Sequence, residues 1–257
     1  MQKLDEHLIL IRGLARNQEH WGPFKPKILD TFKQVEFLDL AGNGTEAHRS
    51  SFIKIEHYTD DLRKRSHFIG RQPKPILLGI SLGGMVAIDW AYRFPQELKA
   101  IILINVSLGA ISPPWKRLQP NALKYLKSIL LNTATQDPFA REMHILRLVS
   151  QQKKSVKEKW AAQFSHVPPT ALKNFLRQLV AAARFKGSIR KPQLPVLLLA
   201  SKNDRMVNVD CSYKIHRFWR CALQIHDWGG HDLSFDDPDW VVDRLTDFLK
   251  DPKYFLR

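Results

Sequence analysis

Six short runs of Val, Ile and Leu recur along the 257-residue chain, separated by longer and more polar segments. Runs that are apolar at nearly every position, rather than at every second one, are typical of strands buried on both faces of a parallel sheet. We therefore expect strands at about 7–12, 35–40, 75–80, 100–105, 195–200 and 222–228.

Segments with helical spacing separate most of these runs. After the third run, for example, Met85, Ile88 and Tyr92 fall on one face of a helix. The last helix is expected to begin with Asp237 as its N-cap and Pro238 in its first turn. Alternating strands and helices predict right-handed crossovers and an α/β fold, with a mostly parallel central sheet of about six strands flanked by helices.

One interval, 112–191, interrupts this alternation, because it holds amphipathic helical patterns but no strand of comparable quality. We interpret it as a helical cap inserted into a core domain that is made of 1–111 and 192–257. The apolar stripes of its helices would pack on one another and on the core. These helices are expected over about 121–131, 155–164 and 170–185.

Composition limits where the protein can work. No apolar run approaches the about 18 residues that a membrane helix needs, and the first twenty residues lack a signal-peptide core. The two cysteines, Cys211 and Cys221, have no metal-type spacing and cannot staple a chain of this length. Reduced thiols and a cytoplasmic location are therefore expected.

The stretch from 75 to 91, PILLGISLGGMVAIDWA, begins as a strand and ends as a helix, with small residues at the junction. Gly79, Ser81 and Gly83 form the pattern G-x-S-x-G, in which a tight turn exposes the serine hydroxyl and aims the next backbone N–H at a developing oxyanion. A glycine-rich turn of this kind can instead do no more than allow close packing, or it can bind a phosphate at the helix start. Because the strings typical of phosphate loops are missing, we favour a nucleophilic serine.

A serine hydroxyl needs a base, and in this pattern the base follows the acid in chain order. His231 lies in a Gly-Gly loop between the last expected strand and the last helix, which is where such a base belongs. The nearest competitor among the ten histidines is His226, inside the strand.

The acid that orients the base is expected a few residues beyond the fifth strand, where Asp204 stands. Asp210 lies too far into the following helix. Asp227 and Asp232 are too close in sequence to His231 to reach its Nδ1 easily. Asp204 is therefore the preferred partner.

The strings GISLGG, SKNDRMV and GGHD occur in an order and at separations that resemble the α/β-hydrolase superfamily, in its single-chain esterase-like branch with a helical cap. The resemblance covers essentially the whole chain. Within the family, the chain is loosely similar to acyl-carrier-protein ester esterases. It implies a triad of Ser81, Asp204 and His231 that needs no metal or cofactor. It also implies an oxyanion hole made by the backbone N–H groups of Leu14 and Leu82.

The chain departs from the family pattern after the first strand. Many members have His-Gly there, whereas this chain has Arg12 and Gly13, which brings a positive charge near the expected site. Main-chain donation from Leu14 is expected to survive this change. Two strands that often begin the family fold are missing, which again predicts six strands.

Charge is concentrated in the expected cap. Residues 112–191 contain sixteen Lys and Arg against three Asp and Glu, which accounts for +13 of the total net charge of +15. A positive field over the entrance favours an anionic substrate, an acidic carrier protein or an anionic lipid surface. Nucleic acid is not favoured, because the segment has no reading motif and few aromatics among its basic residues.

The sequence thus predicts a serine hydrolase that cleaves a carboxylic ester or thioester through an acyl-enzyme intermediate. The substrate is expected to be small or carrier-bound, and anionic. Two alternatives stay open: a C–C bond hydrolase or lyase that uses the same triad, and a non-catalytic protein that uses the pocket as a receptor.

Overall fold

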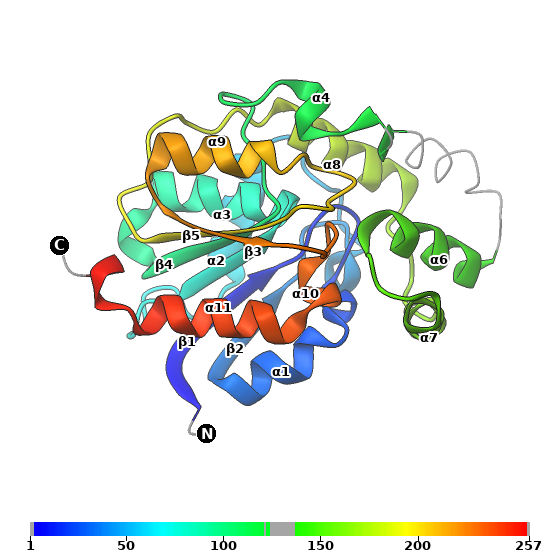
Figure 1. Ribbon diagram of the computed structural model, residues 1–257, viewed down its shortest axis with the longest axis horizontal. Helices are drawn as coiled ribbons and strands as arrows, with labels where there is room; N and C mark the ends of the chain where they lie inside the picture. The colour runs from blue at the N-terminus through cyan, green and yellow to red at the C-terminus, as the bar shows by residue number, and fades with distance from the viewer. Residues whose placement is uncertain (1–2, 121, 124–136, 256–257) are drawn as a thin grey trace.

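The computed structural model describes residues 3–120, 122–123 and 137–255. Its centre is a six-stranded sheet with the order β2-β1-β3-β4-β5-β6, in which every pairing is parallel (Figure 1). The six expected strands and the α/β class are confirmed. The strands are β1 Leu4–Ile11, β2 Phe32–Leu38, β3 Ile76–Ile80, β4 Ala100–Ile104, β5 Val196–Ser201 and β6 Ala222–His226.

The apolar runs form strands because both faces of the sheet are covered. In β1, Leu8 and Leu10 pack into the core on one face, while Ile9 and Ile11 pack into the core on the other. Every residue of β3 and β4 is buried. An uninterrupted apolar run is the pattern that such double burial requires.

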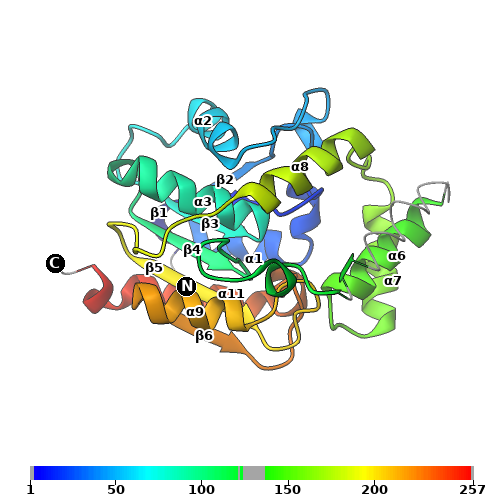
Figure 2. The same ribbon diagram turned by 90° about the horizontal axis from the view of Figure 1, so that it is seen from above.

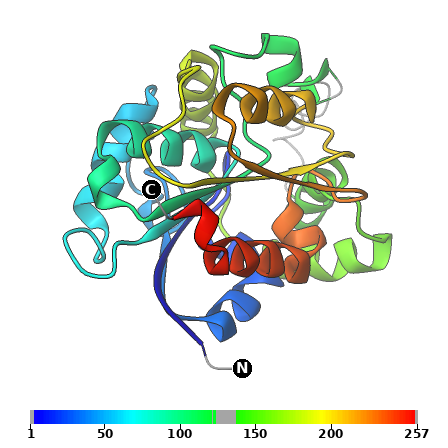
Figure 3. The ribbon, with the colours of Figure 1, turned by 60° about the vertical axis from the view of Figure 1, so that its left-hand side comes forward.

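Helices form a layer on each face. One layer contains α2, α3, α8 and α9, and the other contains α1 and α11; Figure 3 shows α9 and α11 on opposite sides of the sheet. The described helices of four residues or more are α1 Phe24–Thr31, α2 Ile55–Arg65, α3 Leu82–Arg93, α4 Pro114–Arg117, α6 Pro138–Val149, α7 Lys154–Phe164, α8 Leu172–Arg184, α9 Asp210–Trp219, α10 Leu233–Asp236 and α11 Pro238–Lys250, with the 3₁₀ turn Gln18–Trp21 of η1 before α1.

The last helix begins as expected. The Asp237 carboxylate accepts a hydrogen bond from the Trp240 backbone N–H at 3.0 Å, and Pro238 follows the cap. Within the described ranges, no helix is long and apolar enough to cross a membrane.

The described part of the segment between β4 and β5 holds α4, α6, α7 and α8. The helices expected over 155–164 and 170–185 are confirmed as α7 and α8, whereas the one expected over 121–131 lies almost entirely outside the described residues. Helix α6 was not expected from the sequence, although its N-cap Asp137 and the following Pro138 are a start signal.

These helices divide into two groups. Ala181 of α8 belongs to the core cluster that also covers the sheet, and Figure 2 shows α8 alongside α3. By contrast, α6 and α7 pack on each other at one end of the molecule (Figures 1 and 2). Their apolar residues form a separate cluster with Met206, Val207 and Phe235. The two helices are thus attached to the loops that follow β5 and β6.

Glycines permit the close approach of backbone at the turn between β3 and α3. A Cβ added to Gly79 would lie 2.6 Å from the Gly83 carbonyl carbon, and one added to Gly83 would lie 2.6 Å from the Arg12 carbonyl oxygen. No side chain fits at either position without moving main chain.

We expect Gly79→Ala to lower the free energy of unfolding by about 3 kcal/mol, since the methyl group meets rigid backbone. Gly70→Ala is the matched control, because a Cβ there would meet nothing within 4 Å and only its φ of +80° opposes the change. That strain costs about 1 kcal/mol. Chemical denaturation of both variants checks the order, and equal losses would contradict it.

Candidate active site

Ser81 stands in the strained turn between β3 and α3. Its φ of 54° and ψ of −112° are unusual for a residue with a side chain. The backbone is held by hydrogen bonds from Ser81 N–H to the Ile104 carbonyl and from Met85 N–H to the Ser81 carbonyl, both 3.0 Å. Ser81 is the N-cap residue of α3, all of whose residues the structure describes. Its hydroxyl makes no hydrogen bond to the backbone of that helix. It lines a cavity instead.

The structure brings Asp204 and His231 together. Nδ1 of His231 lies 2.7 Å from Oδ2 of Asp204, and both residues are buried. The other carboxylate oxygen accepts the backbone N–H groups of Met206 at 2.7 Å and Val207 at 3.0 Å. Because a carboxylate only accepts, Nδ1 must carry the proton. In the neutral ring, Nε2 of His231 is then the acceptor, which is the arrangement that a general base would use.

Two residues that the sequence offered as alternatives to His231 and Asp204 lie outside the cavity. Nδ1 of His226 accepts the Gly229 N–H at 2.8 Å, and its Nε2 lies 3.2 Å from Oδ2 of Asp237, at the start of α11. Asp227 pairs with Lys202 at the surface, 2.5 Å apart. Neither His226 nor Asp227 lines the cavity that holds Ser81.

Asp232 and Arg12 form a buried ion pair, supported by the Ser234 hydroxyl, which donates to Asp232 at 2.9 Å. Burial favours the neutral acid, but Arg12 and Ser234 hold the pKa of Asp232 below its ordinary value. Arg12 also stacks over the Trp21 ring, 4.8 Å from its centre. The positive charge expected near the site is therefore present but compensated. Asp210 is also engaged, in a pair with Lys116.

Asn105 fixes the loop that carries His231. This role of Asn105 was not predicted from the sequence. Its Nδ2 donates to the carbonyl oxygens of Gly230 at 3.1 Å and His231 at 2.9 Å, and its Oδ1 accepts the Ser201 N–H at 3.0 Å. Its φ of 49° is one that asparagine tolerates. The only sequence signal was its position directly after β4.

Asp236 holds the same loop from the opposite side. Its carboxylate accepts the N–H groups of Gly230 at 2.6 Å and Gln151 at 2.9 Å, together with the Ser150 hydroxyl at 2.5 Å. Burial raises the pKa of Asp236 despite these donors. The junction between α6 and α7 is thus bonded directly to the His231 loop.

The loop after β1 lies against Ser81. A Cβ placed on Gly13 would be 3.3 Å from Ser81 Cβ and 3.9 Å from Ser81 Oγ, so only a small residue fits there. Leu14, the next residue, lines the cavity. Leu82 is the first residue of α3, where a backbone N–H has no acceptor within its own helix.

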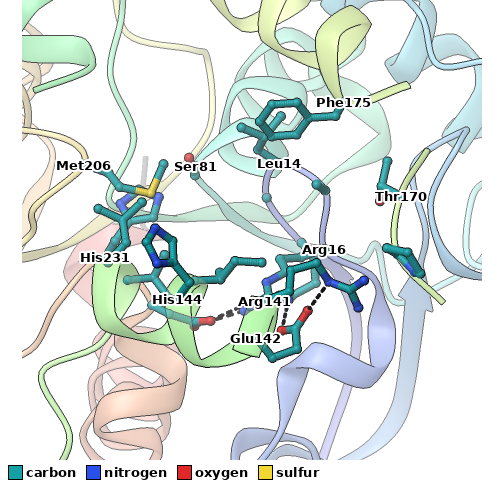
Figure 4. Close-up of a pocket in the computed structure, with 18 of the residues that line it drawn as sticks. Leu14, Arg16, Ser81, Arg141, Glu142, His144, Thr170, Phe175, Met206 and His231 are labelled. Carbon is teal, nitrogen blue, oxygen red and sulfur yellow. Dashed lines mark hydrogen bonds and ion pairs between the residues drawn. The ribbon is translucent and has the colours of Figure 1, made fainter. Parts of the chain in front are cut away.

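The cavity has a volume of about 580 Å³, a size suited to a small-molecule site. Ser81 and His231 line it together. Figure 4 shows them with Met206 on one side, and Arg16, Arg141 and Glu142 gathered on another. Its apolar lining includes Leu14, Ile145, Leu148, Leu172, Phe175 and Met206.

Comparison with known proteins gives relatives over almost the whole chain. The carbamate hydrolase RutD of Agrobacterium fabrum is 24% identical over 250 residues, which cover 94% of this chain and 92% of the relative. The pimeloyl-[acyl-carrier protein] methyl ester esterase of Vibrio parahaemolyticus is 32% identical over 127 residues, 48% of this chain and 46% of the esterase.

A thermophilic esterase from Thermogutta terrifontis has the same fold, with a TM-score of 0.74 at 17% identity, over 97% of this chain and 91% of that one. The model of the family described as serine aminopeptidase, S33, matches residues 8–251. The chain therefore belongs to the S33 serine aminopeptidase family. It is a hydrolase of the α/β-hydrolase superfamily, with esterase-like relatives.

Proposed function

We propose that the protein is a serine hydrolase that cleaves a carboxylic ester or thioester through an acyl-enzyme intermediate. One observation carries the proposal: a buried carboxylate and imidazole, 2.7 Å apart, share a loop cluster with a serine in a strained turn at the wall of one cavity. These residues are of the types that acyl transfer uses as acid, base and nucleophile, which supports the proposal.

In this mechanism the Ser81 oxygen attacks the carbonyl carbon while Nε2 of His231 accepts the hydroxyl proton. Asp204 orients the ring and stabilises the imidazolium. The backbone N–H groups of Leu14 and Leu82 stabilise the oxyanion. His231 then protonates the leaving alcohol or thiol. Water next attacks the acyl-enzyme while His231 accepts its proton, and His231 returns that proton to the Ser81 oxygen as the acid is released.

Residues 112–191 are proposed to act as the cap that selects the substrate, since α6 supplies one wall of the cavity. We propose an anionic or carrier-bound ester, with an acidic carrier or an anionic lipid surface at the basic cap. The names of two relatives, a carbamate hydrolase and an esterase that acts on a carrier-bound methyl ester, agree with acyl transfer to water. A cytoplasmic location is supported by two free, buried cysteines.

Labelling with a fluorophosphonate tests the proposal. Wild-type protein should be labelled at Ser81 and should hydrolyse short acyl esters, whereas Ser81→Ala should lose both activities and keep its fold. Ser165→Ala is the control, because that hydroxyl donates to the Ala162 carbonyl of its own helix. Labelling without ester turnover would favour the C–C bond hydrolase or lyase, and no labelling would favour the receptor.

Asp204→Asn should lower kcat by about 10⁴-fold, the loss seen when the acid of a serine-protease triad becomes an amide that permits the wrong tautomer. Asp227→Asn changes a neighbouring carboxylate that pairs only at the surface and should leave kcat nearly unchanged. Steady-state kinetics on one ester compares the two. A loss of only severalfold in Asp204→Asn would remove Asp204 from its proposed role.

Asn105→Gly keeps the left-handed backbone accessible but removes both bonds to the His231 loop. We expect kcat to fall about tenfold, given what a lost buried hydrogen bond costs, while KM changes little. The rate of fluorophosphonate labelling should fall with kcat. A variant that is merely less stable to heat, with kcat intact, would show that Asn105 does not position the base.

A further inference from the structure

Two arginines share one carboxylate inside the cavity. Nη1 of Arg16 lies 2.6 Å from Oε2 of Glu142, and Nε of Arg141 lies 3.5 Å from Oε1 of the same residue. Figure 4 shows the three side chains together. Arg16 comes from the loop after β1, and the other two come from the first turns of α6.

Arg141 is not satisfied by this arrangement. Its Nε and Nη2 atoms are shielded from solvent, and among the described residues neither has a hydrogen-bond acceptor. The 3.5 Å contact of Nε with Glu142 is an ion pair without a hydrogen bond. A guanidinium stays charged at any ordinary pH, and among the described residues Glu142 offers Arg141 only this longer contact while it pairs more closely with Arg16.

Four arginines line the cavity, Arg12, Arg16, Arg141 and Arg147, against the carboxylates of Glu142 and Asp232, so its described lining carries an excess of positive charge. Glu142 balances only one of the two arginines, and Arg12 is already paired with Asp232. Burial, together with Arg16, Arg12 and Arg141, lowers the pKa of His20 well below its ordinary value, so this nearby ring is neutral. The guanidinium of Arg141, which lines the cavity, can make a charge-assisted hydrogen bond to a carboxylate.

We propose that Arg141 binds a carboxylate of the substrate, so that the enzyme acts on monoesters or monothioesters of dicarboxylic acids. The proposal rests on the hydrolase function proposed above and names its substrate class. The ester carbonyl lies at Ser81, and the free carboxylate lies at Arg141 on another wall of the cavity. The apolar side chains of Leu14, Ile145 and Phe175, which line the same cavity, suit the methylene chain between the two ends.

The acyl part is the one that enters, because a cavity of about 580 Å³ cannot hold a carrier or another large leaving group. This site also differs from the basic surface of α7. Lys154, for example, is 79% exposed and acts only through a field that salt screens. Recognition by Arg141 is local and depends on the shape of its guanidinium.

The test compares two chromogenic esters of equal chain length: the p-nitrophenyl monoester of adipic acid and p-nitrophenyl hexanoate. Wild-type enzyme should prefer the acid. In Arg141→Gln the ratio of the two kcat/KM values should fall by about 10- to 100-fold, the range for a hydrogen bond to a charged group. The ratio for Arg141→Lys should lie between those of the wild type and Arg141→Gln, since lysine keeps the charge but lacks the planar fork.

Lys154→Gln is the matched control, because it removes the same charge from α7 outside the cavity and should leave the ratio unchanged. A ratio that is the same in wild type and Arg141→Gln, while both esters are hydrolysed, would overturn the carboxylate site and leave the hydrolase function standing. A ratio that falls equally in Lys154→Gln would assign the preference to the general field, and would also overturn the site.

Binding to Ser81→Ala separates the two proposals, because it needs no turnover. Calorimetry should give a Kd for monomethyl adipate at least tenfold below that for methyl hexanoate, and the double variant with Arg141→Gln should lose the difference. This result without ester hydrolysis by the wild type would support the site and refute the hydrolase function. Tighter binding of an ester of equal length that ends in a phosphate would refute the choice of carboxylate.

Discussion

The close approach of main chain around Ser81 is the constraint on which the rest of the site depends. Gly83 lets the first turn of α3 touch the carbonyls at the end of β1, and Gly13 lets the following loop touch Ser81 itself. These contacts fix the distance between the serine and the loop that carries Leu14, Arg12 and Arg16. A larger residue at Gly83 would force α3 away from the end of β1, and one at Gly13 would press directly on Ser81.

Local sequence patterns predicted the strands, the turn and the meeting of Asp204 with His231, because each depends on near neighbours and on the rule that parallel strands end at one edge. The roles of Asn105 and Asp236 could not be predicted in this way. Both act through bonds to main-chain groups far away in the sequence, 125 residues for Asn105 with Gly230 and 85 for Asp236 with Gln151. No composition or spacing encodes such partners.

A count of charges along the chain predicted the sign of the surface but not the location of the important charges. The described basic residues of 112–191 have different surroundings: Lys154 is solvated, Arg117 donates to helix carbonyls, and Arg141 lines the cavity. Arg12 looked exceptional in the sequence, yet Asp232 compensates it. What distinguishes a functional cation is a missing partner, and partners become visible only after folding.

Both ends of α6 are anchored. Glu142 ties its first turns to Arg16 of the core, and the residues just beyond its last turn are bonded to Asp236 beside the His231 loop. Between these anchors, His144, Ile145 and Leu148 face the cavity. Because Ile145 and Leu148 have no polar side-chain atoms, they take no part in the hydrogen bonds that hold the His231 loop, and this part of the helix lining can be exchanged while the proposed catalytic geometry is kept. Substrate range and catalytic power are therefore separable in this protein, and selection can alter one without sacrificing the other.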